Sequence, residues 1–568
     1  MTATGWTASK IALVLLPTAL SAWLVLGAEL ETTQRWFVDT SFYLLLGTVL
    51  CWAGTYLHAA QLRKETALAW MKENWPGLVI AFAVTVIAGL AVQPALRILS
   101  DEANLVGTSK NFFASRTATF TVSGKNYYDS YWDVDVAIDR RPTLFPFAVS
   151  LVHAVCGYSY RNVFLFNLLV LPAFVLVSYR LAKSLGGETF AIASSLLTLA
   201  HPITLLSARS GGFDFFATFF ALLVLKSLLD YGRERAPAQL AILWMNACLF
   251  AEIRYETALF ILLLVVLLLA FRMFSGSALL PHAFIYALTP VYLLPRIWQA
   301  ILRGNVPEQD PGVVPFSVEN FAANAHEYFE PLLSPSQSHP AHSALVLALG
   351  LVGCLGWLRW LARRVLAKDW QAPQLRFAVC VASWMLLQAI ISFSYAWGRA
   401  QFPSAARLLL SFDTFFSFAA AWLLTRLLER WKPFIAVLLA AAIFVIQVPI
   451  ASQHRMLNRL TQTRESAATW KFFERLNEKR ILIVTDRPNL FTIMDYGAMN
   501  FETARQDPYL FTAFARHLFY DIYVIQPIQL ATNEPLPGYQ LWPTRKLDTV
   551  LEFQNDANVL VRISRVAH

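Results

Sequence analysis

Long apolar runs follow one another along most of this 568-residue chain, and they limit its fold more than any other feature. A run of about 20 apolar residues is long enough to cross a bilayer as a helix. Hydrophobic residues make up 57% of the chain and charged residues only 15%, whereas a soluble domain usually has about 25% charged residues. The sequence therefore predicts a polytopic α-helical membrane protein with about thirteen spans. These spans are expected near residues 11–30, 36–58, 77–99, 161–183, 188–206, 213–231, 238–252, 255–274, 281–301, 342–360, 376–394, 408–428 and 433–450.

Basic residues between the spans indicate the orientation of the chain. Cytoplasmic loops of membrane proteins are enriched in Lys and Arg. If the N-terminus is cytoplasmic, every main basic cluster falls on the cytoplasmic side, including those at residues 63–72, 233–235, 359–368 and 426–432. The opposite face then receives the segments 100–160, 207–214, 252–256, 302–341 and 395–407, together with the C-terminal part of the chain.

Three parts of the chain differ in character. Residues 1–76 look like additional N-terminal transmembrane helices, and residues 77–450 form the main transmembrane domain, with outer loops at 100–160 and 302–341. From residue 451 onward the apolar runs are short, as in buried strands, and helical patterns separate them. Residues 451–568 are therefore expected to form a small soluble extracytoplasmic α/β domain. Its expected strands are 480–485, 522–526 and 559–563, and its expected helices include 465–476 and 510–518.

The charge and the cysteines exclude several classes of protein. The net charge is +9, but the basic residues form short clusters between apolar runs, which fits membrane topology better than nucleic-acid binding. The five cysteines lie in or beside apolar segments without a CxxC pair, so neither a disulfide framework nor a zinc site is indicated. The first apolar run is long and ends without a clear cleavage site, so we expect a retained span rather than a signal peptide.

Two adjacent carboxylates stand where an apolar run meets the first large outer loop. The run from about Gly77 to Leu99 ends directly before Ser100, Asp101 and Glu102. Because a carboxylate is costly to hold near lipid, an acid pair at this boundary indicates a functional site. The alternative interpretation is that the two acids are the solvated end of a helix.

The same loop places aromatic residues and carboxylates close together. Aromatic faces stack on sugar rings, and carboxylates accept hydrogen bonds from sugar hydroxyls. This pattern indicates a sugar- or acceptor-binding surface, with an interfacial aromatic belt as the alternative. The candidate residues are Tyr128, Asp129, Trp132 and Asp133. Asp133 and Asp135 also have the DxD spacing of a metal–nucleotide-sugar motif, but nucleotide sugars are cytoplasmic and this loop is expected outside.

Arginines mark the other outer segments. Arginine binds phosphate bidentately and stays charged at any relevant pH. Such cations near the bilayer surface would bind a lipid-phosphate donor and stabilise the leaving phosphate. For Arg254 the alternative is an ion pair with Glu252 or Glu256, and for Arg399 and Arg407 it is contact with lipid headgroups. The candidates are Arg209, Arg254, Arg399 and Arg407.

The histidines show no metal-binding pattern. They are scattered along the chain without an HExxH motif or a close ligand pair, and the sequence has no serine nucleophile elbow. We therefore expect structural roles for the histidines and require neither a metal ion nor a cofactor. The histidines concerned are His153, His201, His282, His339 and His342.

These features together resemble the GT-C glycosyltransferases, which are multispanning enzymes that use polyprenyl- or dolichyl-phosphate sugars. The resemblance covers roughly residues 77–430. Within the family, the chain is most similar to the lipid A aminoarabinose transferases and the protein O-mannosyltransferases. Two departures concern the arginines: no Tyr follows Arg407, and Arg254 precedes Tyr255 where the family often has Lys-Gly. The matching stretches are Ser100 to Ala103, Arg141 to Gly157, the turn Ser207 to Asp214, and Ser404 to Leu410.

The resemblance implies transfer of a sugar from a polyprenyl-phosphate donor to a hydroxyl of a lipid, glycan or protein acceptor, with inversion, at the extracytoplasmic face. Asp101 would be the general base, and Glu102 would assist it by positioning the acceptor or the sugar. The outer arginines would bind the donor phosphate, and Asp214 would join Asp129 in binding sugar or acceptor. The expected location is a bacterial inner membrane, with the site and the C-terminal domain in the periplasm.

Three other functions fit parts of the pattern. A transporter or lipid flippase explains the spans, but it predicts charges near the midplane and inverted repeats, whereas the polar residues here gather at one face. A polytopic glycan-binding or assembly protein would bind sugar without turnover. Within the enzymes, an oligosaccharide ligase using a diphosphate-linked lipid is the nearest alternative.

Overall fold

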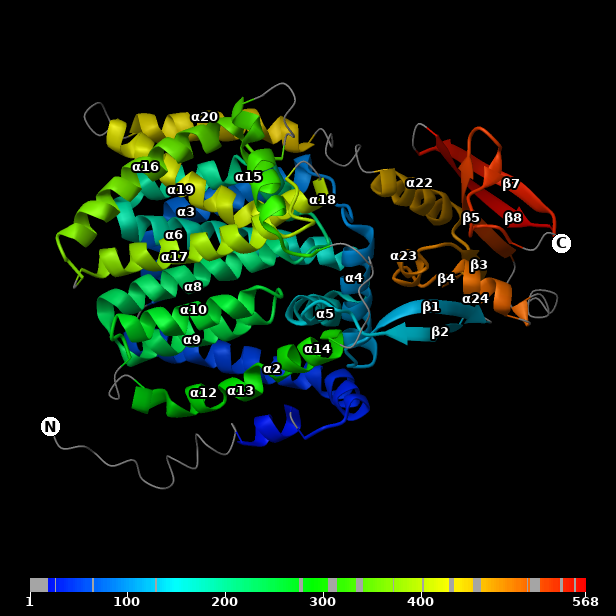
Figure 1. Ribbon diagram of the computed structural model, residues 1–568, viewed down its shortest axis with the longest axis horizontal. Helices are drawn as coiled ribbons and strands as arrows, with labels where there is room; N and C mark the ends of the chain where they lie inside the picture. The colour runs from blue at the N-terminus through cyan, green and yellow to red at the C-terminus, as the bar shows by residue number, and fades with distance from the viewer. Residues whose placement is uncertain are drawn as a thin grey trace. The chain divides into compact units, whose positions relative to one another are not determined.

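Two compact units make up the chain in the computed structural model (Figure 1). The first contains Met1–Pro94, Arg140–Phe145 and Phe164–His454, and the second contains Ala95–Asp139, Pro146–Val163 and Arg455–His568. The residues that the structure describes are 19–25, 27–63, 66–127, 130–274, 279–304, 314–333, 341–370, 372–400, 403–428, 434–452, 461–507, 509–510, 521–541, 545–555 and 558–567.

The first unit is helical. Among the described residues, eight helices are long and apolar enough to cross a membrane. They are α2 (Leu30–Arg63), α3 (Ala67–Ala91), α6 (Asn162–Leu199), α8 (Asp214–Glu234), α16 (Ala344–Leu366), α17 (Pro373–Ser394), α19 (Leu410–Leu427, preceded by η2, Arg407–Leu409) and α20 (Phe434–Ser452). Shorter helices are α7 (Pro202–Ser207), α9 (Pro237–Ala251), α10 (Thr257–Ala270), η1 (Leu280–His282), α12 (Ala283–Ala287), α13 (Thr289–Tyr292), α14 (Leu294–Gly304), α15 (Val318–Leu333) and α18 (Pro403–Ala406).

The predicted polytopic helical fold is confirmed, but the count of thirteen spans is not. The expected spans 161–183 and 188–206 both lie within α6, where the non-helical Gly187 (φ 81°, a conformation that glycine favours) separates two helical segments. The expected span 281–301 is divided into short helices, because prolines interrupt its apolar run. The turn predicted at 252–256 is present between α9 and α10. The charged residues of this turn therefore lie outside both helices.

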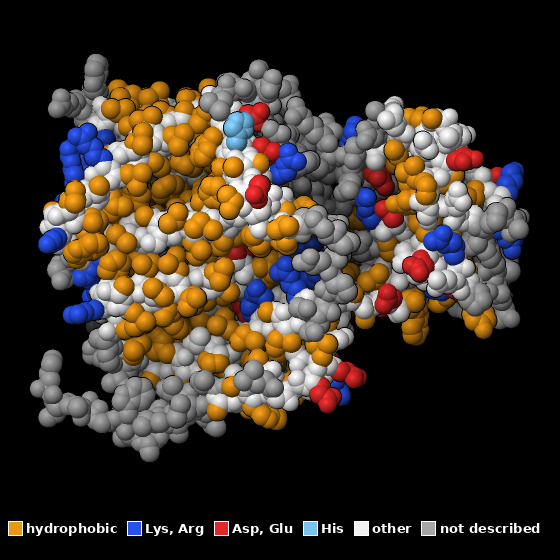
Figure 2. All heavy atoms as spheres, in the orientation of Figure 1, with side chains coloured by type: hydrophobic (Ala, Val, Ile, Leu, Met, Phe, Trp, Pro, Cys, Tyr) orange, Lys and Arg blue, Asp and Glu red, His pale blue; other side chains and the backbone are white. Residues whose placement is uncertain are grey.

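The outer surface of the helical unit is largely apolar. Figure 2 shows hydrophobic side chains spread over the visible face of this unit. The strongly exposed hydrophobic residues of the unit include Phe82, Leu90 and Ile446. A soluble monomer rarely exposes so large a contiguous apolar surface. The apolar surface therefore supports the interpretation that this is an integral membrane protein whose helices face lipid.

Small residues let α16 and α19 approach closely. A Cβ atom at Gly350 would lie 2.6 Å from the backbone oxygen of Phe416, and Gly353 lies against the backbone of Ala419. Close contact through small residues is a common way for helices to pack in membranes. This contact holds α19 in place. α19 carries Asp413, which belongs to a buried polar cluster, and it lines the apolar cavity; both are described below.

The second unit contains an eight-stranded mixed sheet with the order β2-β1-β4-β3-β5-β8-β7, in which β6 pairs with β5. β3 pairs in parallel with β4 and β5, whereas β8 pairs antiparallel with β5 and β7. All four residues of β3 are buried, as expected for a central strand. The strands are β1 (Phe120–Tyr127), β2 (Ser130–Ala137), β3 (Ile481–Val484), β4 (Gly497–Met499), β5 (Asp521–Gln529), β6 (Glu534–Pro535), β7 (Leu547–Gln554) and β8 (Val559–Val566).

Residues 451–568 do not build this sheet alone. The three strands expected in that region are present as β3, β5 and β8, and the expected helix 465–476 lies within α22 (Thr461–Leu476). β1 and β2 come instead from the segment 100–160, which the sequence analysis assigned to an outer loop. They form a hairpin, and Gly124 of β1 pairs with Ala498 of β4. Most of the expected helix 510–518 lies outside the described residues.

Short and medium helices complete the second unit, and one of them carries the acid pair. α4 (Leu99–Ala114) is fixed to the C-terminal part of the unit by Lys110, whose Nζ donates to the carbonyl of Thr492 at 2.8 Å and pairs with Asp495 at 2.7 Å. Besides α22, the other helices are α5 (Leu144–Cys156, of which residues from Pro146 belong to this unit), α23 (Asn489–Thr492) and α24 (Phe501–Gln506).

Candidate functional site

Asp214 is the first residue of α8 and lies between two arginines. Arg254, from the turn between α9 and α10, donates to Oδ1 of Asp214. Arg407, in η2, donates through Nη1 to Oδ2 at 2.8 Å. A carboxylate at a helix N-terminus also interacts favourably with the positive end of the helix dipole. Three distant segments of the first unit thus converge on one carboxylate, and we call these three residues the arginine cluster.

Two further contacts orient the arginines. Nε of Arg254 lies 2.5 Å from Oε1 of Glu256, which is one of the ion pairs considered above as the alternative role of Arg254. The Phe213 ring lies beside both guanidiniums, with its centroid 5.5 Å from Cζ of Arg254 and 6.0 Å from that of Arg407. Such cation–π contacts restrict the rotamers of both side chains.

The arginine cluster is partly open. The side chain of Asp214 is 3% exposed, whereas those of Arg254 and Arg407 are 16% and 14% exposed. All three residues line a small polar pocket. Because two guanidiniums already hold a carboxylate there, this position is suited to an oxyanion, including a phosphate.

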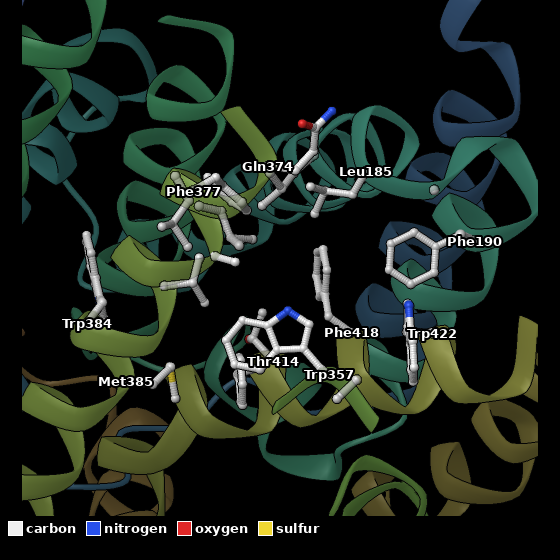
Figure 3. A pocket seen from close by; sticks show the side chains of 18 of the residues that line it. Leu185, Phe190, Trp357, Gln374, Phe377, Trp384, Met385, Thr414, Phe418 and Trp422 are labelled. Atoms are coloured by element: carbon white, nitrogen blue, oxygen red, sulfur yellow. The ribbon is translucent and has the colours of Figure 1, made fainter. Parts of the chain in front are cut away.

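A large apolar cavity lies next to this pocket in the same unit. Its volume is about 690 Å³, within the range of roughly 300–1,000 Å³ that is usual for ligand sites. Figure 3 shows aromatic side chains around the space, including Trp357, Phe418 and Trp422. The walls come from α6, α8, α16, α17 and α19.

The cavity and the polar pocket are adjacent and share part of their walls. Thr218, Trp384 and Ser411 line both spaces. Trp384 also stacks on Phe260, with ring centroids 4.5 Å apart, and this contact fixes one side of the junction. The arrangement joins a cationic, anion-binding end to a long apolar space, which matches the chemistry of an amphiphile with an anionic head.

The acid pair lies in the first turn of α4, in the second unit. Asp101 is half-buried, and Glu102 is buried, with Oε2 accepting a hydrogen bond from the backbone N–H of Arg97 at 2.8 Å. The sequence interpretation placed both acids in a loop directly after a span. The span instead ends at Ala91, close to Pro94, and the acids begin a separate helix.

Two of the predicted phosphate-binding arginines do not belong to the arginine cluster and have other partners. Arg399 is half exposed and pairs with Glu327 of α15 at 2.8 Å. Arg209 donates through Nε to the carbonyl of Val92 at 3.1 Å, and burial lowers its pKa from the ordinary value. Their roles in phosphate binding stay predictions.

The structure describes two of the four residues of the loop that were predicted to bind sugar or acceptor, Trp132 and Asp133. Trp132 is 61% exposed on β2, and Asp133 of the same strand accepts a hydrogen bond from the hydroxyl of Thr121 at 2.7 Å. Tyr128 and Asp129 lie outside the described residues. The sugar-binding role of this surface stays a prediction, as does that of Asp214.

Several residues of this site were not singled out from the sequence. The aromatic residues of the cavity lie within apolar spans, where they cannot be distinguished from ordinary packing residues. The structure also gathers His201, His342 and Asp413 into a group that could hold a metal ion, although no metal site was expected from the sequence. These two histidines are too far apart in the chain to form a ligand pattern.

No family model and no curated protein matches the sequence. The structure is similar to that of ArnT from Cupriavidus metallidurans bound to undecaprenyl phosphate, with 14% identity, a TM-score of 0.52, and coverage of 88% of this chain and 98% of that chain. The apo state of the same ArnT gives 14% identity, a TM-score of 0.53, and coverage of 87% and 98%. The apo oligosaccharyltransferase of Archaeoglobus fulgidus gives 12% identity, a TM-score of 0.45, and coverage of 80% and 70%.

At this level of identity the comparison with ArnT shows the fold. The chain has an ArnT-like fold, so the predicted resemblance to the GT-C glycosyltransferases is confirmed at the level of fold. The predicted fold class, a polytopic helical membrane protein with a C-terminal strand-rich region, is confirmed with it.

Proposed function

We propose that this protein is an integral-membrane glycosyltransferase that moves a sugar from a polyprenyl-phosphate donor to an acceptor hydroxyl. The observation that carries the proposal is the junction between the arginine cluster and the apolar cavity. A polyprenyl phosphate has an anionic head and a long apolar chain, so each part of the donor has a matching surface in the first unit. ArnT, whose fold this chain shares, was solved bound to undecaprenyl phosphate.

The donor phosphate would bind Arg254 and Arg407 at the position that Asp214 now shares with them. The polyprenyl chain would extend into the apolar cavity along the aromatic side chains. When the bond to the sugar breaks, negative charge grows on the phosphate, and preorganised guanidiniums stabilise that charge. A leaving phosphate held in this way needs no proton from a second acid.

Asp101 is proposed as the general base, on the resemblance of its sequence context to the GT-C family. Its carboxylate would take the proton of the acceptor hydroxyl while that oxygen forms a bond to the anomeric carbon. The bond from this carbon to the phosphate oxygen breaks in the same displacement, so the configuration inverts. The buried Glu102 beside it, held through the backbone of Arg97, would assist by positioning the acceptor or the sugar.

The location follows from the same proposal. We propose that the N-terminus is cytoplasmic and that the reaction occurs on the extracytoplasmic face of a bacterial inner membrane. The positive-inside distribution of Lys and Arg supports this orientation. The acceptor is a hydroxyl of a lipid, glycan or protein. Arginines alone hold the monophosphate in this proposal, and no step requires a metal ion.

The test is sugar transfer from labelled polyprenyl-monophosphate donors by wild type, Asp101→Asn and Glu502→Gln in purified membranes. Removing a positioned base slows proton transfer by about 10²–10⁴-fold, so Asp101→Asn should lose transfer at that scale. Glu502 is an exposed acid in the first turn of α24 and serves as the matched control. Asp101→Asn with near-normal turnover would remove Asp101 as the base.

Two further assays in the same preparation decide the reaction class. If folded wild-type protein releases label only from diphosphate-linked donors, the protein is an oligosaccharide ligase of that kind and the monophosphate proposal fails. If no donor is consumed, lipid flipping in proteoliposomes tests the transporter alternative. The labelled product identifies the class of acceptor.

A further inference from the structure

A second polar cluster, closed and distinct from the arginine cluster, lies among the helices of the first unit. His201 precedes α7 as its N-cap residue, His342 lies just before α16, and Asp413 is in the first turn of α19. The backbone N–H of Ile203 donates to the carbonyl of Ala341 at 3.0 Å, which holds the two histidine-bearing segments together. We call His201, His342 and Asp413 the histidine cluster.

The two imidazoles face the same carboxylate. Nδ1 of His342 lies 2.8 and 3.0 Å from the two oxygens of Asp413, and Nδ1 of His201 lies 3.5 Å from Oδ1. One ligand atom from each of the three residues lies within 4.8 Å of the others. Ligands around a tetrahedral zinc ion with bonds of about 2.0 Å are roughly 3.3 Å apart, so these separations are close to those of a metal site.

The charge of Asp413 needs a partner in this buried place. The side chains of His201, His342 and Asp413 are 0%, 2% and 1% exposed. Among the described residues no Lys or Arg pairs with Asp413, and its remaining recorded contact is the hydroxyl of Tyr328, which donates at 3.0 Å. A buried carboxylate without a cation is strongly unfavourable, and neutral imidazoles supply no charge.

The outer nitrogens of both rings also lack a recorded partner. Nε2 of His201 and Nε2 of His342 are buried without a hydrogen bond to any described residue. The polar contacts recorded for His342 are made with Asp413 alone. Nδ1 of His201 also accepts a hydrogen bond from the backbone N–H of Ser343 at 3.1 Å, so a metal ion bound at this nitrogen would replace that contact. The Nδ1 atoms of both rings face the carboxylate.

We propose that His201, His342 and Asp413 bind a Zn²⁺ ion. Two imidazoles and one carboxylate form a ligand set that zinc takes in proteins, and imidazole favours zinc over Mg²⁺ or Ca²⁺, which prefer oxygen ligands. The ion supplies the positive charge that Asp413 requires. Tyr328 supports the carboxylate from outside, as partners around metal ligands commonly do.

The ion would tie three helices at one point. The residues directly before α7 and α16 and the first turn of α19 each contribute one ligand, and η2, which carries Arg407, leads directly into α19. The zinc would therefore hold in place the segment that bears one arginine of the arginine cluster. The proposal does not depend on the proposed reaction, because metal content and spectra test it without any substrate.

The test is the zinc content of the full-length protein, purified with a tag that contains no histidines and measured by mass spectrometry of the metal. Wild type should contain about one zinc per chain, and His342→Gln and Asp413→Asn should bind it at least about tenfold more weakly, the scale seen even for residues around metal ligands. His326→Gln changes an exposed histidine of α15 and should keep the metal.

Cobalt substitution keeps the proposal testable if the variants do not fold. Co²⁺ added to chelator-treated wild-type protein should give visible bands of tetrahedral coordination by nitrogen and oxygen, and Zn²⁺ should remove them. Wild-type protein that takes up neither metal would overturn the proposal and leave a protonated histidine as the partner of Asp413. Equal zinc content in wild type, His342→Gln and Asp413→Asn would overturn it as well.

Discussion

The arginine cluster and the histidine cluster use one arrangement for two purposes. In each, a carboxylate in the first turn of a helix lies between two basic side chains from distant segments: Asp214 in α8 and Asp413 in α19. The arginine cluster lines a pocket, and its guanidiniums are 14–16% exposed. The histidine cluster is almost completely buried.

The difference shows how access decides the role of a buried charge. Arginines that line a pocket can exchange one anion for another, because solvent and ligand reach them. A carboxylate enclosed by imidazoles cannot release its partners without separating helices. Changes in the arginine cluster should therefore alter binding, whereas changes in the histidine cluster should alter stability.

The largest stability effect is expected for Asp413→Ala. Removing one partner of a buried ionic group costs about 3–5 kcal/mol, because the remaining groups are left uncompensated. The change should lower the midpoint of chemical unfolding in detergent. Asp369→Ala is the control, since its ion pair with Arg364 is solvent-exposed and such pairs contribute about 0–1 kcal/mol. Equal midpoints for both variants would remove the structural role of the histidine cluster.

Arg407→Ala and Arg254→Ala should weaken donor binding with little change in the unfolding midpoint. Losing a charged hydrogen bond costs about 1.5–3 kcal/mol, or roughly 10- to 150-fold in affinity. The measurement is binding of a polyprenyl phosphate to each purified variant. Arg363→Ala, near the end of α16, is the control for lost positive charge. Unchanged affinity in both cluster variants would move the phosphate site elsewhere.

Ala378→Trp should narrow the apolar cavity. Ala378 lines it from α17, and an overfilled site typically costs about 1–3 kcal/mol, so a long-chain polyprenyl phosphate should bind roughly tenfold more weakly or worse. A phosphate with only two isoprenoid units should be much less affected. Leu386→Trp, on the exposed side of the same helix, should bind both lipids normally. If both lipids lose affinity equally, the chain does not occupy this cavity.

Asp214→Asn should give the smallest effect and separates two roles of this residue. As a counter-ion, Asp214 competes with the phosphate, so its neutral variant should bind bare polyprenyl phosphate a few-fold more tightly. As a sugar ligand, its loss should weaken only the donor that carries a sugar. Comparing the two lipids in one binding assay distinguishes these outcomes.

The sequence predicts the fold class well because membrane spans and buried strands have local patterns. The turn at 252–256 was found from its charges alone, since charged residues are unfavourable inside a span. The helix beginning at Leu99 was missed, although acids such as Asp101 and Glu102 are typical of a first helical turn. Both acids were assigned to the start of the loop after the preceding apolar run instead.

The sites are less predictable because they depend on contacts between distant segments. Asp214 and Arg407 are 193 positions apart, and His342 and Asp413 are 71 apart. The strand β2 was also missed, because its exposed Trp132, Val134 and Val136 do not look like one half of a buried sheet. Its place became visible only through the pairing of β1 with both β2 and β4.

The contacts of α4 and β1 with the C-terminal part of the second unit cannot form until that part has been synthesised. Lys110 donates to Thr492, which is 382 positions later in the chain. At about 5–20 residues per second, the ribosome needs on the order of 20–80 s to reach Thr492. During this interval the hairpin has an open edge while the intervening helices enter the membrane. A chain that stops early would keep that edge unpaired, and an unpaired strand edge can pair with another chain.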